Sequence, residues 1–161
     1  MRFGHGHFLP QRGQRVAVAR GGGVERDVEF TGNRVKGEFA PDFEHEDFPL
    51  GGGLDYLLVL DSAAANASDA LLGEKSVVLV DAELVPDPPK GAFSTRALPF
   101  AETARQLGNR RVANIVALGA LAGSGPICDN TALEACLRDM APAKYADLNV
   151  EAFRAGQRLV A

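Results

Sequence analysis

Residues 54–61 read LDYLLVLD and residues 76–81 read SVVLVD, and these two stretches give the strongest indication of the fold. Each is a short apolar run that ends at an aspartate, without the alternation of polar and apolar residues that a half-exposed strand shows. Such runs are typical of central strands in a parallel sheet, because both faces of that sheet are covered. We therefore expect two neighbouring parallel strands here.

The flanking segments alternate between helix and strand signals. We expect a helix over residues 62–72 (SAAANASDALL), a third strand over 95–98, and a helix over 100–107 that stops at Gly108. A turn of three glycines, residues 21–23, leads into a further strand that ends at Phe30. Alternating elements predict right-handed crossovers. The expected fold class is α/β, three-layered, with a mainly parallel sheet and flanking helices.

Residues 113–122 (ANIVALGALA) are apolar almost all round, which predicts a buried helix. Gly119 and Gly123 would allow another backbone to approach it closely. Asn114 near its start is then expected to be a buried amide, which needs specific hydrogen-bond partners. Two arginines, Arg110 and Arg111, come directly before this helix.

Two more helices are expected at the end of the chain. The pattern Thr131-x-x-Glu134 predicts a capping box for a helix through Met140, with Cys136 filling core space. Asn149 is expected to cap a final helix. Phe153 should lie on the inner face of that helix.

Composition limits the domain count and the class of partner. With 161 residues, 46% of them hydrophobic, we expect a single domain over residues 1–161. Residues 1–15 are expected to be an irregular arm and residues 36–53 an acidic loop. The net charge of −4 gives no electrostatic case for nucleic acid or an anionic membrane. The uneven placement of charge fits either a solvated surface or a charged partner subunit.

Compartment and metal content are inferred from the cysteines and histidines. Cys128 and Cys136 form neither a disulfide framework nor a zinc motif, so a cytoplasmic protein is expected. No apolar run is long enough to span a membrane, and no signal peptide is expected. His5 with His7, and the acidic residues 42–47, are better interpreted as solvated chain than as metal ligands. We expect no metal site.

Two aspartates mark the ends of the central strands. Asp61 and Asp81 stand where open α/β sheets usually bind ligands. The alternative is that each caps the helix or turn that comes after it. No pair of nucleophile and base is evident, so no catalytic residue is assigned to this chain.

Three segments carry a family resemblance: GNRRVANIVALGALAG, TALEACLRDM and LNVEAFRAGQRLV. They are similar to the C-terminal half of the gamma subunit of 2-oxoacid:acceptor oxidoreductases, the pyruvate, indolepyruvate and phenylglyoxylate:ferredoxin group. The stretch ARGGGVERDV resembles the Arg-Gly-Gly turn and strand of that family. The family usually opens with a GxGGQG strand–turn–helix, which this sequence does not show. The N-terminal βα unit is therefore expected to be shortened, missing or supplied by a partner.

The resemblance implies a subunit of a multi-subunit enzyme that oxidatively decarboxylates a 2-oxoacid to an acyl-CoA, with ferredoxin or NAD accepting the electrons. It implies thiamine-binding alpha- and beta-type subunits and an iron–sulfur, ferredoxin-like subunit as partners in a hetero-oligomer. Thiamine diphosphate, magnesium, iron–sulfur clusters and coenzyme A are implied in those partners, and none is held by this chain alone. The chain would contribute to assembly and to the coenzyme A side of the site.

The resemblance also implies six residues as contacts of that shared site. Arg20, Gly21, Gly22 and Asn114 are expected to line the inter-subunit face. Arg110 and Arg111 are expected to contact phosphate or carboxylate, or else to be surface charges at a helix entry. Two rival functions remain: a free-standing α/β module that binds a nucleotide or coenzyme A without redox chemistry, and a purely structural paralogue.

Overall fold

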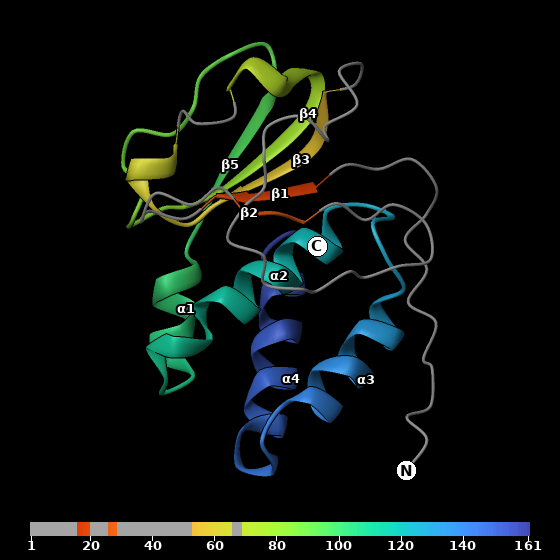
Figure 1. Ribbon diagram of the computed structural model, residues 1–161. Helices are drawn as coiled ribbons and strands as arrows, with labels where there is room; N and C mark the ends of the chain where they lie inside the picture. Colours follow the sequence, from red (N-terminus) through yellow and green to blue (C-terminus); the bar gives the residue numbers. More distant parts are fainter. Residues whose placement is uncertain (1–15, 20–25, 29–52, 66–68) are drawn as a thin grey trace.

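The computed structural model describes residues 16–19, 26–28, 53–65 and 69–161. The strands of these residues form a five-stranded sheet in the order β2-β1-β3-β4-β5 (Figure 1). They are β1 (Val16–Ala19), β2 (Arg26–Val28), β3 (Leu54–Val59), β4 (Leu72–Asp81) and β5 (Ser94–Leu98). The pairs β1–β3, β3–β4 and β4–β5 are parallel, and β2 runs antiparallel to β1. The expected mainly parallel sheet is confirmed.

The apolar runs of β3 and β4 are buried on both faces, as their sequences predict. Because side chains alternate along a strand, Tyr56 and Leu58 join one core cluster while Leu57 and Val59 join another. Both clusters are closed to solvent, and Leu57 and Val59 are fully buried. The two aspartate-terminated runs therefore form the centre of the sheet.

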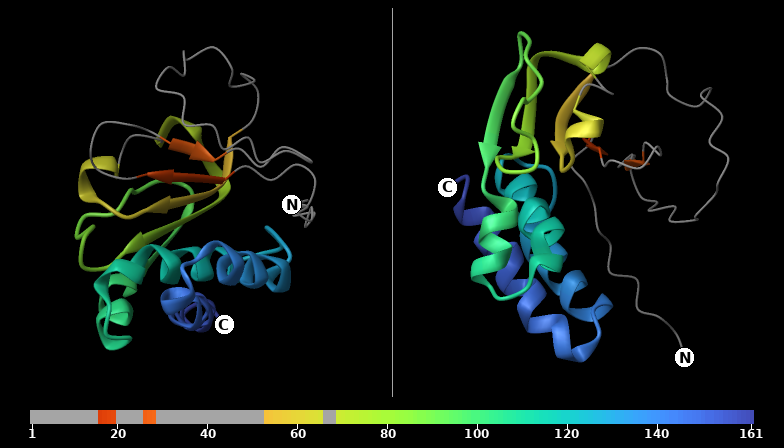
Figure 2. Two further views of the ribbon diagram at one scale, coloured as in Figure 1. Left: turned by 60° about the horizontal axis from the view of Figure 1, so that its bottom comes forward. Right: turned by 90° about the vertical axis from the view of Figure 1, so that its left-hand side faces the viewer.

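The four α-helices lie together on one side of the sheet (Figures 1 and 2). They are α1 (Phe100–Gln106), α2 (Ala113–Gly123), α3 (Asn130–Met140) and α4 (Ala143–Arg158). As expected, α1 is followed by Gly108, whose φ of 81° lies in the left-handed region that favours glycine. In the part of the chain that is described, no helix is long and apolar enough to cross a membrane.

The opposite face of the sheet is covered by short turns and a loop. Val85 from the β4–β5 connection and Ala65 are buried there, with Phe93 packed against them. The helix expected over residues 62–72 is wrong: the described part of this stretch forms the 3-10 helices η1 (Ser62–Ala64) and η2 (Asp69–Leu71) and the first residue of β4. Ser, Asn and Asp side chains compete for backbone hydrogen bonds and so favour turns.

Two caps at the end of the chain also differ from expectation. Asp129, and not Thr131, caps α3, because its carboxylate accepts hydrogen bonds from the backbone N–H of Thr131 at 2.8 Å and of Ala132 at 3.2 Å. The last helix begins at Ala143, directly after Pro142, so Asn149 lies within α4 instead of capping it. Phe153 is fully buried on its inner face, as expected.

Helices α2 and α4 touch through their backbones at two glycines. A methyl group on Gly119 of α2 would overlap the carbonyl oxygen of Phe153, and one on Gly156 of α4 would overlap the carbonyl oxygen of Val116. The close approach expected at Gly119 is thus confirmed. Gly156 supplies the matching gap on the other helix, which allows Val116 and Phe153 to be fully buried.

We expect Gly156→Ala to lower the free energy of unfolding by about 1–3 kcal/mol, because the added methyl forces the two helices apart. This is the net loss after the gain of about 1 kcal/mol that alanine brings to a helix interior. Urea denaturation of the purified protein measures it. The matched control is Gly123→Ala in α2, whose methyl would meet a side-chain methyl of Val160 at 2.8 Å but backbone atoms only at 3.4 Å and beyond. Equal stability of the two variants would contradict the prediction.

Candidate functional site

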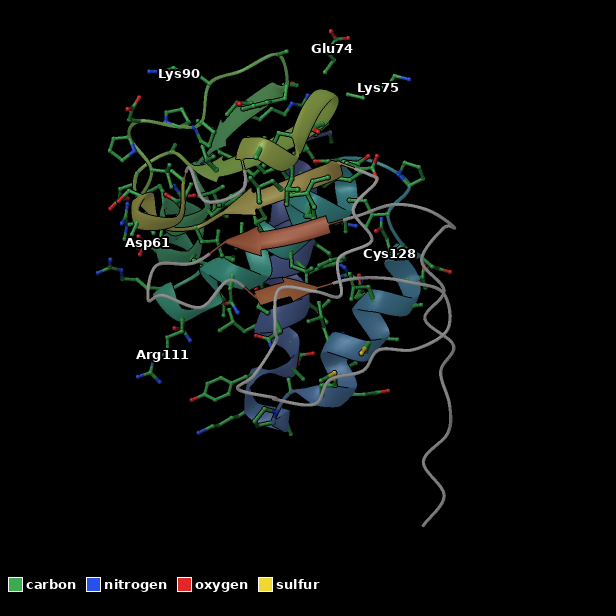
Figure 3. The ribbon with its side chains drawn as sticks, turned by 45° about the horizontal axis from the view of Figure 1, so that its top comes forward. Asp61, Glu74, Lys75, Lys90, Arg111 and Cys128 are labelled. Carbon is green, nitrogen blue, oxygen red and sulfur yellow. The ribbon has the colours of Figure 1, made fainter. Side chains whose placement is uncertain are left out.

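The carboxyl edge of the sheet is where β3, β4 and β5 all end, at Val59, Asp81 and Leu98. Open parallel sheets bind ligands at this edge. Strand β1 ends here too, at Ala19, and Arg20, Gly21 and Gly22 come next in sequence but lie outside the described residues. Figure 3 shows Asp61 and Arg111 on this side of the molecule, with Cys128 on the opposite side.

Asp81 is a buried carboxylate, 1% exposed, whose two oxygens both accept backbone hydrogen bonds. Its Oδ1 accepts from the N–H groups of Glu83 at 2.9 Å and Leu84 at 3.0 Å, and its Oδ2 accepts from the N–H of Ala101 at 2.7 Å. Asp81 therefore joins the end of β4 to the first turn of α1. The capping interpretation of this residue is confirmed.

Asp61 also has a capping role, at the end of β3. Its Oδ1 accepts a hydrogen bond from the N–H of Ala63 at 2.8 Å and so begins η1. Unlike Asp81, it bonds within two residues of itself and does not link separate elements. Both aspartates thus shape the carboxyl edge through backbone hydrogen bonds.

The short helix η3 (Arg110–Val112) connects α1 to α2 and carries the two arginines. Asn109 begins it, because its side chain accepts a hydrogen bond from the N–H of Arg111 at 3.0 Å. Val112 is buried and anchors η3, whereas Arg110 and Arg111 are exposed. Figure 3 shows the Arg111 side chain extending away from the ribbon.

Asn114 is exposed, so the expectation of a buried amide is wrong. The buried residues of α2, among them Val116, Ala117 and Ala120, face the sheet and α4, while Asn114 lies in the first turn on another face. Arg110, Arg111 and Asn114 are all exposed around the start of α2, and these three residues are called the polar surface below.

An ion-pair network lies beside this surface. Arg105 donates hydrogen bonds to Glu83, at the carboxyl edge, and to Glu102 in its own helix. The pKa of Glu83 is lowered, first by the hydrogen bonds from Arg105 and further by the charges of Arg105 and Arg110. Glu83 and Arg105 were not singled out from the sequence. Only the i,i+3 spacing of Glu102 and Arg105 could have indicated part of the network.

The charge of Arg105 is matched by these carboxylates, whereas Arg110 and Arg111 form no ion pair with the residues that the structure describes. Exposed guanidinium groups in this state can bind a phosphate or a carboxylate through paired N–H donors. The polar surface of Arg110, Arg111 and Asn114 is therefore suited to an anionic group.

The cysteines are free, and Cys128 lies apart from this surface (Figure 3). Cys128 is half-buried, and burial, together with the charge of Asp129, raises the pKa of its thiol. Cys136 is exposed, so its expected place in the core is wrong: α3 has no buried residue and leaves that side of the helix to solvent. Within the described ranges, no group of three or more His, Cys, Asp or Glu could hold a metal ion.

A family model described as pyruvate ferredoxin/flavodoxin oxidoreductase matches residues 20–159. Comparison with curated protein sequences gave no match. The family match includes Arg20–Gly22, the carboxyl edge of the sheet and the polar surface formed by Arg110, Arg111 and Asn114.

Solved structures agree with this match. The gamma subunit of a keto/oxoacid ferredoxin oxidoreductase from Geobacter sulfurreducens is 33% identical, with a TM-score of 0.62 over 66% of this chain and 64% of that one. Pyruvate oxidoreductase subunit PORC from Thermotoga maritima is 26% identical, with a TM-score of 0.57 over 68% and 65%.

A 2-oxoglutarate:ferredoxin oxidoreductase from Magnetococcus marinus, solved with 2-oxoglutarate, coenzyme A and succinyl-CoA bound, has the same fold. It is 22% identical, with a TM-score of 0.59 over 68% of this chain and 20% of that one. The aligned region thus spans less than two thirds of the length of each of the three solved chains.

We expect Asp81→Ala to lower the free energy of unfolding by about 3 kcal/mol, because three backbone N–H groups lose their charged acceptor, one of them buried. Asp61→Ala is the control, and it should cost only about 1 kcal/mol, as is usual for loss of a cap. Thermal or urea unfolding of both variants measures the difference. If both lose the same stability, Asp81 does not link β4 to α1 as described.

Proposed function

Because the chain belongs to the pyruvate ferredoxin/flavodoxin oxidoreductase family, we propose that it is the gamma subunit of an enzyme that oxidatively decarboxylates a 2-oxoacid to an acyl-CoA. Carbon dioxide is released, and the electron pair passes to ferredoxin or NAD. The observation that carries this proposal is the family match over residues 20–159. The 33% identity to a gamma subunit of the same enzyme class supports it.

The chain acts as one subunit of this enzyme and does not contain a complete active site. Its two cysteines cannot supply the four thiolates of an iron–sulfur cluster. The residues that the structure describes also lack a cluster of ligands that fits a metal ion. In this proposal, thiamine diphosphate with magnesium belongs to thiamine-binding partner subunits, and the clusters belong to a ferredoxin-like partner. Free cysteines fit a reducing cytoplasm.

Thiamine diphosphate supplies carbanion stabilisation in such a decarboxylation. The contribution of this chain is to bind and orient an anionic substrate at the boundary between subunits. Arg110 and Arg111 are exposed guanidinium groups that fit the phosphates of coenzyme A. Asn114, on the same surface, adds an amide donor and acceptor. Arg20, Gly21 and Gly22 complete this inter-subunit face in the proposal.

Copurification tests the subunit role. We expect the tagged full-length chain, isolated from the cells that produce it, to carry a thiamine-binding subunit and an iron–sulfur subunit in fixed ratio. Mass spectrometry identifies these partners, and reduction of ferredoxin or NAD in the presence of a 2-oxoacid and coenzyme A measures the activity. A monomer without such partners contradicts the proposal. Tight binding of coenzyme A by that monomer in calorimetry would instead favour a free-standing binding module.

Variants of the polar surface test the coenzyme A contact. In the assembled enzyme, replacing Arg110 and Arg111 together by Ala should raise the KM for coenzyme A about tenfold, because charge-assisted hydrogen bonds to phosphate are lost. The KM for the 2-oxoacid should not change. Arg158→Ala, an exposed arginine in the last turn of α4, is the control.

Asn114→Ala separates a ligand role from a structural one. Intact assembly with a raised KM for coenzyme A supports the ligand role, whereas loss of assembly assigns Asn114 to the subunit contact. If neither the double arginine variant nor Asn114→Ala changes the KM or the assembly, this surface does not belong to the site.

A further inference from the structure

Strand β5 forms one margin of the sheet, and nothing in the described ranges pairs with its outer edge (Figure 2). Its five residues pair with β4 in an unbroken register from Ser94 to Leu98. Ser94, Arg96 and Ala97 are exposed. An edge strand of this kind presents unpaired backbone groups to which another strand can bond.

The direction of these backbone groups can be derived from the bonds that β5 makes with β4. The carbonyl of Leu98 points inward, since it accepts a hydrogen bond from the N–H of Ala82 at 2.9 Å. Backbone groups alternate in direction along a strand. Those of Arg96 therefore also point toward β4, and those of Thr95 and Ala97 point outward along the free edge.

Strand β5 has few of the features that usually protect an edge strand from pairing with another chain. It contains no proline, and no bulge interrupts its pairing with β4. The hydroxyl of Thr95 donates a hydrogen bond to the carbonyl of Pro89 at 3.2 Å, and the outward backbone groups of β5 bond to none of the described residues. Arg96 is the one charged side chain of the strand, and it makes no ion pair with the described residues.

A second copy of this chain fits the edge poorly. In an antiparallel pair in which Thr95 of each copy bonds Ala97 of the other, Arg96 lies opposite Arg96. This non-hydrogen-bonded position brings opposing side chains closest, so two like charges meet there. If the second copy is shifted by two residues in one direction along β5, its Pro99 lies opposite Thr95 and has no N–H to donate. If it is shifted by two residues in the other direction, Ala97 lies opposite Phe93, which is outside the strand.

We propose that the outer edge of β5 binds an extended segment of a partner subunit, which adds a strand to the sheet and places an acidic side chain opposite Arg96. Backbone bonds to Thr95 and Ala97 provide the affinity, and the charge pair sets the register and excludes self-pairing. This inference rests on the proposed function, because the segment belongs to another subunit of the same enzyme.

Hydrogen exchange on the intact complex and on the isolated chain tests the edge directly. The peptide that covers residues 93–99 should exchange about tenfold more slowly in the complex, since the amides of Thr95 and Ala97 become bonded. The amides of Arg96 and Leu98 are already bonded to β4 and should change little. If the complex forms and this peptide exchanges as in the isolated chain, the proposal is overturned while the proposed function stands.

Charge reversal tests the acidic partner segment. Arg96→Glu should weaken binding to the partner subunits about tenfold, because an attractive cross-strand pair becomes repulsive. Lys144→Glu is the control, because Lys144 is exposed in the first turn of α4, at the end that lies away from the sheet. If Arg96→Glu and Lys144→Glu bind the partner subunits equally well, the proposed charge pair at Arg96 is wrong. If no complex is found at all, both this inference and the proposed function fail.

Discussion

The backbone contact between α2 and α4 fixes how the helices sit on the sheet. Gly119 and Gly156 have no side chains to hold the helices apart. The backbone carbonyl groups of Phe153 and Val116 can therefore approach the Cα atoms of these glycines closely. Val116 and Phe153 can then both be fully buried. Close packing of this kind resists even a single added methyl, because protein interiors have little free volume. The position of α2, and of the polar surface at its start, depends on this contact.

A second constraint acts at the carboxyl edge. The Asp81 carboxylate holds the first turn of α1 and the turn after β4 together by three backbone hydrogen bonds. Beside this joint, Arg105 pairs with both Glu83 and Glu102, while Arg110 and Arg111 form no close ion pair with the described residues. The edge that Asp81 shapes is therefore bordered by two exposed arginines, which the proposed function assigns to a site shared between subunits.

Much of the fold was predictable because, in the central elements, the hydrophobic pattern of the sequence matches the burial of the residues in the structure. The runs that form β3 and β4, the strand at Ser94–Leu98 and the helix that stops before Gly108 were all expected from the sequence. Strand β1 was not expected, because four residues are too short for a periodic signal. In the segment between β3 and β4, polar residues that favour turns outweighed helix propensity. The family itself was evident from the segments that surround α2, α3 and α4.

Local sequence is thus sufficient to specify the central strands, the apolar helix α2 and the family, whereas the set of residues that solvent can reach depends on tertiary packing. Asn114 and Cys136 both stand in helices and were expected inside, yet both are exposed, because the elements packed against α2 and α3 cover other faces of those helices. Burial is a property of neighbours that are distant in sequence, and a local pattern does not specify them. For the same reason, only the assembled sheet shows that β5 lies at its margin.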